Sequence, residues 1–112
     1  MIKEIAIMHI ENEISLARRA LAIGNVGKAR VCARRAAGIA VTYWLDLHPE
    51  LHWGESAISM LNKLTEDSSM DGEIRNAAAR LTASVKNQNP LQFTQDPLYD
   101  SNIIINYFLN NK

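Results

Sequence analysis

The sequence predicts an all-α protein: an up-and-down bundle of four to five helices in a single domain that covers residues 1–112. Apolar residues recur at intervals of three and four along most of the chain, which is the period of a helix face. The segment 36–45, AAGIAVTYWL, has Thr42 as its only polar side chain. A helix that is apolar on nearly every face must be surrounded by other helices, so this segment is predicted to be the centre of the bundle.

The first two helices are predicted to form an antiparallel hairpin. The first spans about residues 2–23 and stops at Gly24, and its core-facing stripe is Ile7, Ile10, Ile14, Ala17 and Leu21. The second spans about residues 26–47 and ends before Pro49, because the residue before a proline is pushed out of helical geometry. Two long helices with so short a connection are expected to lie side by side.

Three shorter helices are predicted to follow. One covers about residues 55–64, one begins after Asp71 as a helix cap, and the last opens at Asp96-Pro97 and runs to about Leu109. The residues expected to face the core are Ala57, Leu61 and Leu64 on the first, Ile74, Ala77, Ala78, Leu81 and Val85 on the second, and Ile104, Tyr107 and Phe108 on the third.

Composition excludes several classes of protein. Twelve Lys and Arg balance twelve Asp and Glu, which argues against binding of duplex nucleic acid by charge alone. The chain has no segment of about 20 apolar residues and no signal peptide, so we expect a cytoplasmic protein that does not enter a membrane. The lone Cys32 lies among alanines and is expected to be a small buried hydrophobe. His48 and His52 flank Pro49 and cannot share a helix face, so no metal is expected, and no cofactor motif appears.

Arginines of the second helix are the first candidate for a binding site. Arg30 and Arg34 are one turn apart on the same face, and Arg35 lies about 100° further round. Either these side chains reach into solvent and pair with Glu11 and Glu13, or they bind phosphate or line an interface. Because the N-terminal half of a helix carries a weak positive field, cations placed there indicate a specific partner.

The fourth predicted helix contributes a second candidate. Asn76 and Arg80 are one turn apart, with Arg75 on the flank, and this stripe is able to hold a phosphodiester. Alternatively, Arg75 pairs with Asp71 or Glu73 and Arg80 is solvated.

These features resemble the HEPN superfamily of small all-helical domains. The resemblance lies in the long first helix, the glycine-containing turn 22–25 and the alanine-dense second helix KARVCARRAAGIAVTYWL. It implies a homodimer and, in catalytic members, a metal-independent ribonuclease site with an Arg-x(4 to 6)-His motif. Arg75-Asn76 matches the start of that motif, but position 80 is Arg instead of His. Arginine stays charged and cannot readily act as the base that cleavage through a 2′-hydroxyl requires.

The leading prediction is therefore a non-catalytic HEPN-like interaction module that binds a nucleotide, single-stranded RNA or an acidic protein partner. Its ligand-binding residues are predicted to be Arg30, Arg34, Arg35, Arg75 and Arg80. The alternatives are a toxin-like ribonuclease that uses Arg75, Asn76 and Arg80, and a structural or accessory protein. A homodimer is predicted, because the helices carry more apolar surface than one chain readily covers. Its predicted anchors are Trp44, Trp53, Tyr107 and Phe108. The resemblance also implies a nucleotidyltransferase-type partner protein.

Overall fold

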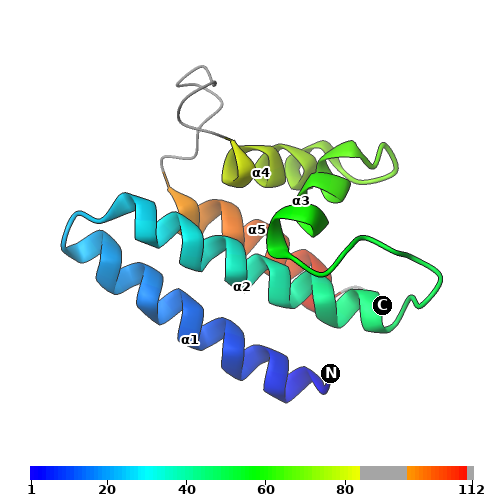
Figure 1. The fold of residues 1–112 in the computed structure, drawn as a ribbon, viewed down its shortest axis with the longest axis horizontal. Coiled ribbons are helices and arrows are strands. Elements are labelled where there is room, and N and C mark those ends of the chain that lie inside the picture. The colour runs from blue at the N-terminus through cyan, green and yellow to red at the C-terminus, as the bar shows by residue number, and fades with distance from the viewer. Residues whose placement is uncertain (84–95, 111–112) are drawn as a thin grey trace.

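The chain folds as an all-helical bundle. The computed structural model describes residues 1–83 and 96–110. Its helices are α1 (Lys3–Ala22), α2 (Val26–Asp46), α3 (Ala57–Glu66), α4 (Gly72–Thr82) and α5 (Pro97–Asn110) (Figure 1). The predicted all-α bundle is confirmed, and the helix ends lie within two residues of those that the sequence indicates. Val85, which was expected to extend the α4 stripe, lies outside the described residues.

α1 and α2 form the predicted antiparallel hairpin (Figure 1). The chain turns at Gly24, whose φ of 79° is a left-handed conformation that glycine adopts without strain. The Asn25 backbone N–H donates to the carbonyl of Ala20 at 2.8 Å, and this bond closes the end of α1. The Asn25 side chain then accepts from the Lys28 N–H at 3.1 Å and caps α2. Turn chemistry within a few residues therefore accounts for the hairpin.

α2 is the central helix, as predicted. It packs against α1 and α5 along its length and also contacts α3 and α4. The side chains with no exposed surface on the predicted central segment are Ala36, Ala37, Ala40 and Val41. Alanines let the neighbouring helices approach closely, so a helix with this composition can be covered on several sides.

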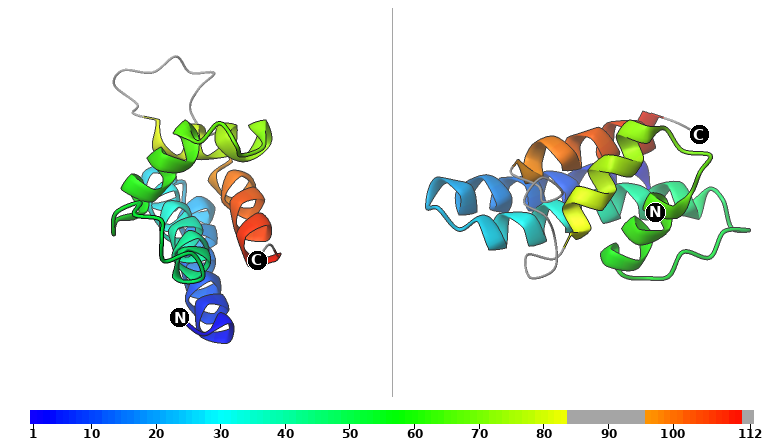
Figure 2. Two further views of the ribbon diagram at one scale, coloured as in Figure 1. Left: turned by 90° about the vertical axis from the view of Figure 1, so that its right-hand side faces the viewer. Right: turned by 90° about the horizontal axis from the view of Figure 1, so that it is seen from above.

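α5 runs in the same direction as α2. Near the starts of the two helices, the Ser101 hydroxyl donates to the Ala33 carbonyl at 2.9 Å. Near their ends, the rings of Trp44 and Phe108 make an edge contact with centroids 5.2 Å apart. The up-and-down arrangement predicted from the sequence therefore holds for the antiparallel helices α1 and α2 but not for the parallel helices α2 and α5. α3 and α4 cover the side of α2 and α5 that lies away from α1 (Figures 1 and 2).

The aromatic side chains anchor the core of one chain, and the prediction that Trp44 and Phe108 anchor a dimer is wrong. Phe108 is fully buried and Trp44 is 9% exposed. Trp53 and Tyr107 are partly buried against the same cluster, with ring centroids 5.5 Å from Trp44 and 5.0 Å from Phe108 respectively. The parallel course of α2 and α5, which sequence spacing does not reveal, brings these rings together.

Candidate anion-binding site

Arg30 is buried and holds the end of α4. Its side chain is only 6% exposed, and its Nη2 donates to the carbonyls of Leu81 at 3.4 Å and Ala83 at 2.6 Å. The last carbonyls of a helix have no partner within the helix and carry partial negative charge, so they suit a guanidinium donor. Burial lowers the pKa of Arg30, and the nearby charge of Arg34 lowers it further. Arg30 therefore does not reach into solvent, which was one of the two predictions for this side chain, but contacts the end of α4.

Arg80 forms an ion pair with a carboxylate from α5. Its Nε and Nη2 both donate to Oδ1 of Asp100, at 3.0 and 2.8 Å. Asp100 is 3% exposed, and its hydrogen bond raises the pKa of Arg80. The alternative prediction, in which Arg80 is solvated and has no partner, is therefore wrong. No local spacing points to Asp100, because it lies 20 residues further along the chain.

Arg75 and Asn76, the other two residues of the α4 stripe, have different surroundings. Arg75 donates from Nε to the Thr65 carbonyl at 3.2 Å, near the end of α3, instead of pairing with Asp71 or Glu73. Asn76 is exposed. The stripe thus contains two guanidinium groups that already have internal acceptors and one exposed amide.

Arg34 and Arg35 differ from the other three candidate arginines. Arg34 is half-buried and Arg35 is exposed. Neither donates a hydrogen bond or forms an ion pair to any residue that the structure describes. Burial lowers the pKa of Arg34, and no carboxylate of the described residues offsets this effect. The positive charge at this point of α2 is therefore not neutralised from within the described chain.

A cavity of about 280 Å³ lies beside these two arginines. It is lined by Val31, Arg34 and Arg35 of α2 and by Ser56, Ala57 and Ile58 at the start of α3. Gly38 lies one turn after Arg34 and permits this approach, because a Cβ at that position would be 2.8 Å from the Ala57 Cβ. The absence of a side chain at Gly38 thus brings the start of α3 against the arginines.

The start of α3 lines the other side of the cavity. Ser56 caps the helix: its hydroxyl oxygen accepts from the Ser59 N–H at 3.0 Å, and its carbonyl accepts from the Met60 N–H at 3.1 Å. The N–H groups of Ala57 and Ile58 belong to the first turn and have no partner within the helix. Guanidinium groups beside the start of a helix form an arrangement that can bind an anion, and the rest of the cavity wall, from Val31, Ala57 and Ile58, is apolar.

Cys32 is the small buried side chain that the sequence indicates, 2% exposed between α1 and α2. Burial raises the pKa of its thiol, and the carboxylate of Glu13 raises it further. A thiol that stays protonated in this way is inert as a nucleophile.

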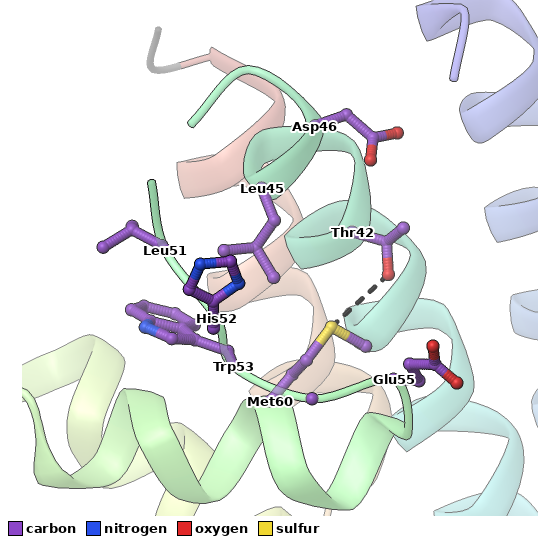
Figure 3. Close-up of a pocket in the computed structure, with 9 residues that line it drawn as sticks. Thr42, Leu45, Asp46, Leu51, His52, Trp53, Glu55 and Met60 are labelled. Atoms are coloured by element: carbon purple, nitrogen blue, oxygen red, sulfur yellow. Dashed lines mark hydrogen bonds between the residues drawn. The ribbon is translucent and has the colours of Figure 1, made fainter. Parts of the chain in front are cut away.

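A second cavity, of about 470 Å³, lies under the loop between α2 and α3 (Figure 3). His52 and Trp53 lie on one side of it and Asp46 and Glu55 on the other, with the Thr42 hydroxyl donating to the Met60 sulfur at 3.4 Å between them. Within residues 1–83 and 96–110, no group of three or more His, Cys, Asp or Glu side chains is placed to hold a metal ion. The sequence does not reveal this cavity, because its walls come from separate elements.

None of the helices in the described residues is long and apolar enough to cross a membrane. Comparison of the chain with protein-family models, curated proteins and solved structures finds no match. The resemblance to HEPN domains therefore stays a prediction.

Proposed function

We propose that the protein is a non-catalytic interaction module that binds phosphate groups of a nucleotide or of single-stranded RNA at Arg34 and Arg35. The observation that carries this proposal is the half-buried Arg34, whose pKa is lowered by burial and which has no acceptor among the described residues. A bound anion supplies the missing acceptor and restores the electrostatic stabilisation that burial removes.

The chemistry of the cavity favours phosphate. A guanidinium donates two parallel hydrogen bonds to a phosphate, and the free N–H groups at the start of a helix complete the coordination of such an anion. The cavity volume of about 280 Å³ is smaller than the roughly 300–1,000 Å³ of pockets that enclose whole small molecules. It therefore suits one phosphate group of a ligand whose remainder lies on the surface.

The binding test is fluorescence anisotropy with labelled single-stranded oligouridylate over a range of salt concentrations. The logarithm of affinity is expected to fall with the logarithm of salt concentration at a slope of about 0.7 for each phosphate contacted. Arg34→Gln and Arg35→Gln should each weaken binding and lower that slope by about 0.7. Arg19→Gln is the matched control, because it removes the same charge from an exposed arginine on α1.

Competition distinguishes the ligand classes. Displacement of the RNA by uridine monophosphate at the same concentration as by inorganic phosphate assigns the site to a single phosphate group, whereas resistance to both assigns it to a chain of phosphates. Binding of a glutamate-rich peptide with no binding of either phosphate ligand would overturn the proposal in favour of an acidic protein partner. Equal losses in Arg34→Gln, Arg35→Gln and Arg19→Gln would show that the binding is non-specific, and would also overturn it.

Catalysis is tested separately, since the ribonuclease alternative rests on Arg75, Asn76 and Arg80. Arg80 is held by Asp100, arginine is a poor proton acceptor, and the sequence has no histidine after His52. Labelled RNA incubated with the purified protein in chelator is therefore expected to stay intact. Cleavage by the wild type that disappears in Arg75→Ala would contradict the non-catalytic assignment.

A further inference from the structure

A groove of about 480 Å³ separates part of α1 from α5. α1 packs mainly on α2 and contacts α5 far less, so the two outer helices leave a channel between them. Its apolar walls include Ile7 and Ile14 of α1 together with Ile105 and Leu109 of α5. This surface is independent of the cavity beside Arg34.

Two opposite charges lie along the α1 side of the groove. Glu11 and Arg18 both line it and are both exposed. They are seven residues apart, so they lie on the same line of the helix, separated by about 10 Å along its axis. Neither forms an ion pair or a side-chain hydrogen bond in the part of the chain that the structure describes.

We propose that the groove is occupied by α1 of a second copy of this chain, which runs antiparallel to the first about a two-fold axis. When the axis passes between Ile14 and Ser15, Glu11 of one protomer opposes Arg18 of the partner subunit. The same operation places Arg18 opposite Glu11 of the partner subunit, because a two-fold interface repeats every contact. One symmetry operator therefore pairs both of these charges, neither of which forms an ion pair within the described residues of the single chain.

The side chains between and beyond the charges are also complementary in size under this operator. Ile7, which is partly exposed, faces Ala22 of the partner subunit, and the 8% of Ile14 that stays exposed faces Ser15 of the partner subunit. A large aliphatic side chain opposite a small one lets antiparallel helices approach closely. Ser15 is partly buried and Ala22 is exposed, so both are accessible to a second helix.

The decisive experiment uses charge reversal and sedimentation equilibrium at micromolar concentrations. The wild type is expected to dimerise. Glu11→Arg and Arg18→Glu should each raise the dimer dissociation constant roughly 100-fold, because each substitution creates two like-charge contacts. Lys63→Glu, an equal change of charge at an exposed position on α3, which lies on the side of the bundle away from α1, is the matched control and should leave the dimer intact. Circular dichroism verifies that each variant keeps its helix content.

Mixing tests the symmetry itself. Equimolar Glu11→Arg and Arg18→Glu chains, each monomeric alone, should form a heterodimer. Both contacts of the interface then join an arginine of one chain to a glutamate of the other. A wild type that stays monomeric throughout overturns the proposal. A dimer that resists both reversals, or variants that do not associate on mixing, also overturn it, since either result places the contact elsewhere or gives it another register.

Discussion

Two arginines one turn apart on α2 have opposite surroundings. Arg30 lies against the end of α4, where carbonyl oxygens accept its hydrogen bonds. Arg34 lies against the start of α3, where the backbone presents N–H donors. The carbonyls at a helix end thus satisfy Arg30 internally, whereas Arg34 has no acceptor among the described residues and is the arginine that we propose binds an external anion.

The largest expected effect tests an arginine with an internal partner. Arg80→Ala leaves the carboxylate of Asp100, whose side chain is 4% exposed, without its cation. The free energy of unfolding should fall by about 3 kcal/mol, measured by urea denaturation. Arg19→Ala should change it by less than about 0.5 kcal/mol. Equal losses in the two variants would show that the Arg80–Asp100 pair contributes no more than a surface charge.

A smaller loss is expected at the start of α2. Arg30→Met keeps an unbranched side chain but removes the donors to the carbonyls of Leu81 and Ala83. The free energy of unfolding should fall by about 2 kcal/mol, as for other hydrogen bonds made by charged groups. Thermal or urea denaturation measures this loss. Unchanged stability would mean that these carbonyls are satisfied without the guanidinium.

Cys32 lies between Arg30 and Arg34 in the sequence and is buried as a neutral thiol, so its pH dependence measures the effect of burial alone. Because burial raises the pKa of its thiol above the ordinary 9.0, the unfolded chain releases a proton above that pH while the folded chain keeps it. The stabilisation is complete below about pH 9.0 and is lost as pH rises through the higher folded pKa. Stability of the wild type should fall more steeply above that pH than stability of Cys32→Ala, by at most about 1.4 kcal/mol per pH unit. If the free energies of unfolding of the two proteins fell in parallel above that pH, the conclusion that burial raises the pKa of Cys32 would be contradicted.

The smallest effect on stability is expected at the candidate anion site. Arg34→Gln removes no internal hydrogen bond that the structure describes, and it removes the charge that lowers the pKa of Arg30. The free energy of unfolding should stay within about 0.5 kcal/mol of the wild type, by urea denaturation, while RNA binding weakens. A loss above about 1 kcal/mol would contradict this prediction and assign Arg34 a structural role.

The helices were predictable because their signals are local. Asp96 and Pro97 open α5 as expected, with the Asp96 side chain accepting from the Tyr99 N–H at 3.1 Å. Asp71 is the residue that caps α4, although its side chain makes no capping hydrogen bond. The central position of α2 can likewise be predicted from its apolar segment, since a helix without a polar face has to be covered by other helices.

The candidate site was predictable only in part. The sequence indicates five candidate arginines but does not show which of them have internal acceptors, because side chains at equivalent helix positions look alike before their neighbours are known. The start of α3 and the close approach at Gly38 were missed, and an isolated glycine inside an alanine-dense helix was the only local signal of that approach.

The ends of the helices and the central position of α2 can be predicted from the sequence alone, because caps, turns and helix periodicity act over a few residues. The direction of α5 and the partners of Arg30, Arg75 and Arg80 follow from the tertiary structure instead. The contacts responsible join residues 20 apart for Arg80 and Asp100, 53 apart for Arg30 and Ala83, and 68 apart for Ser101 and Ala33. Such contacts depend on which helix ends meet in space, and that is set by the packing of the whole core.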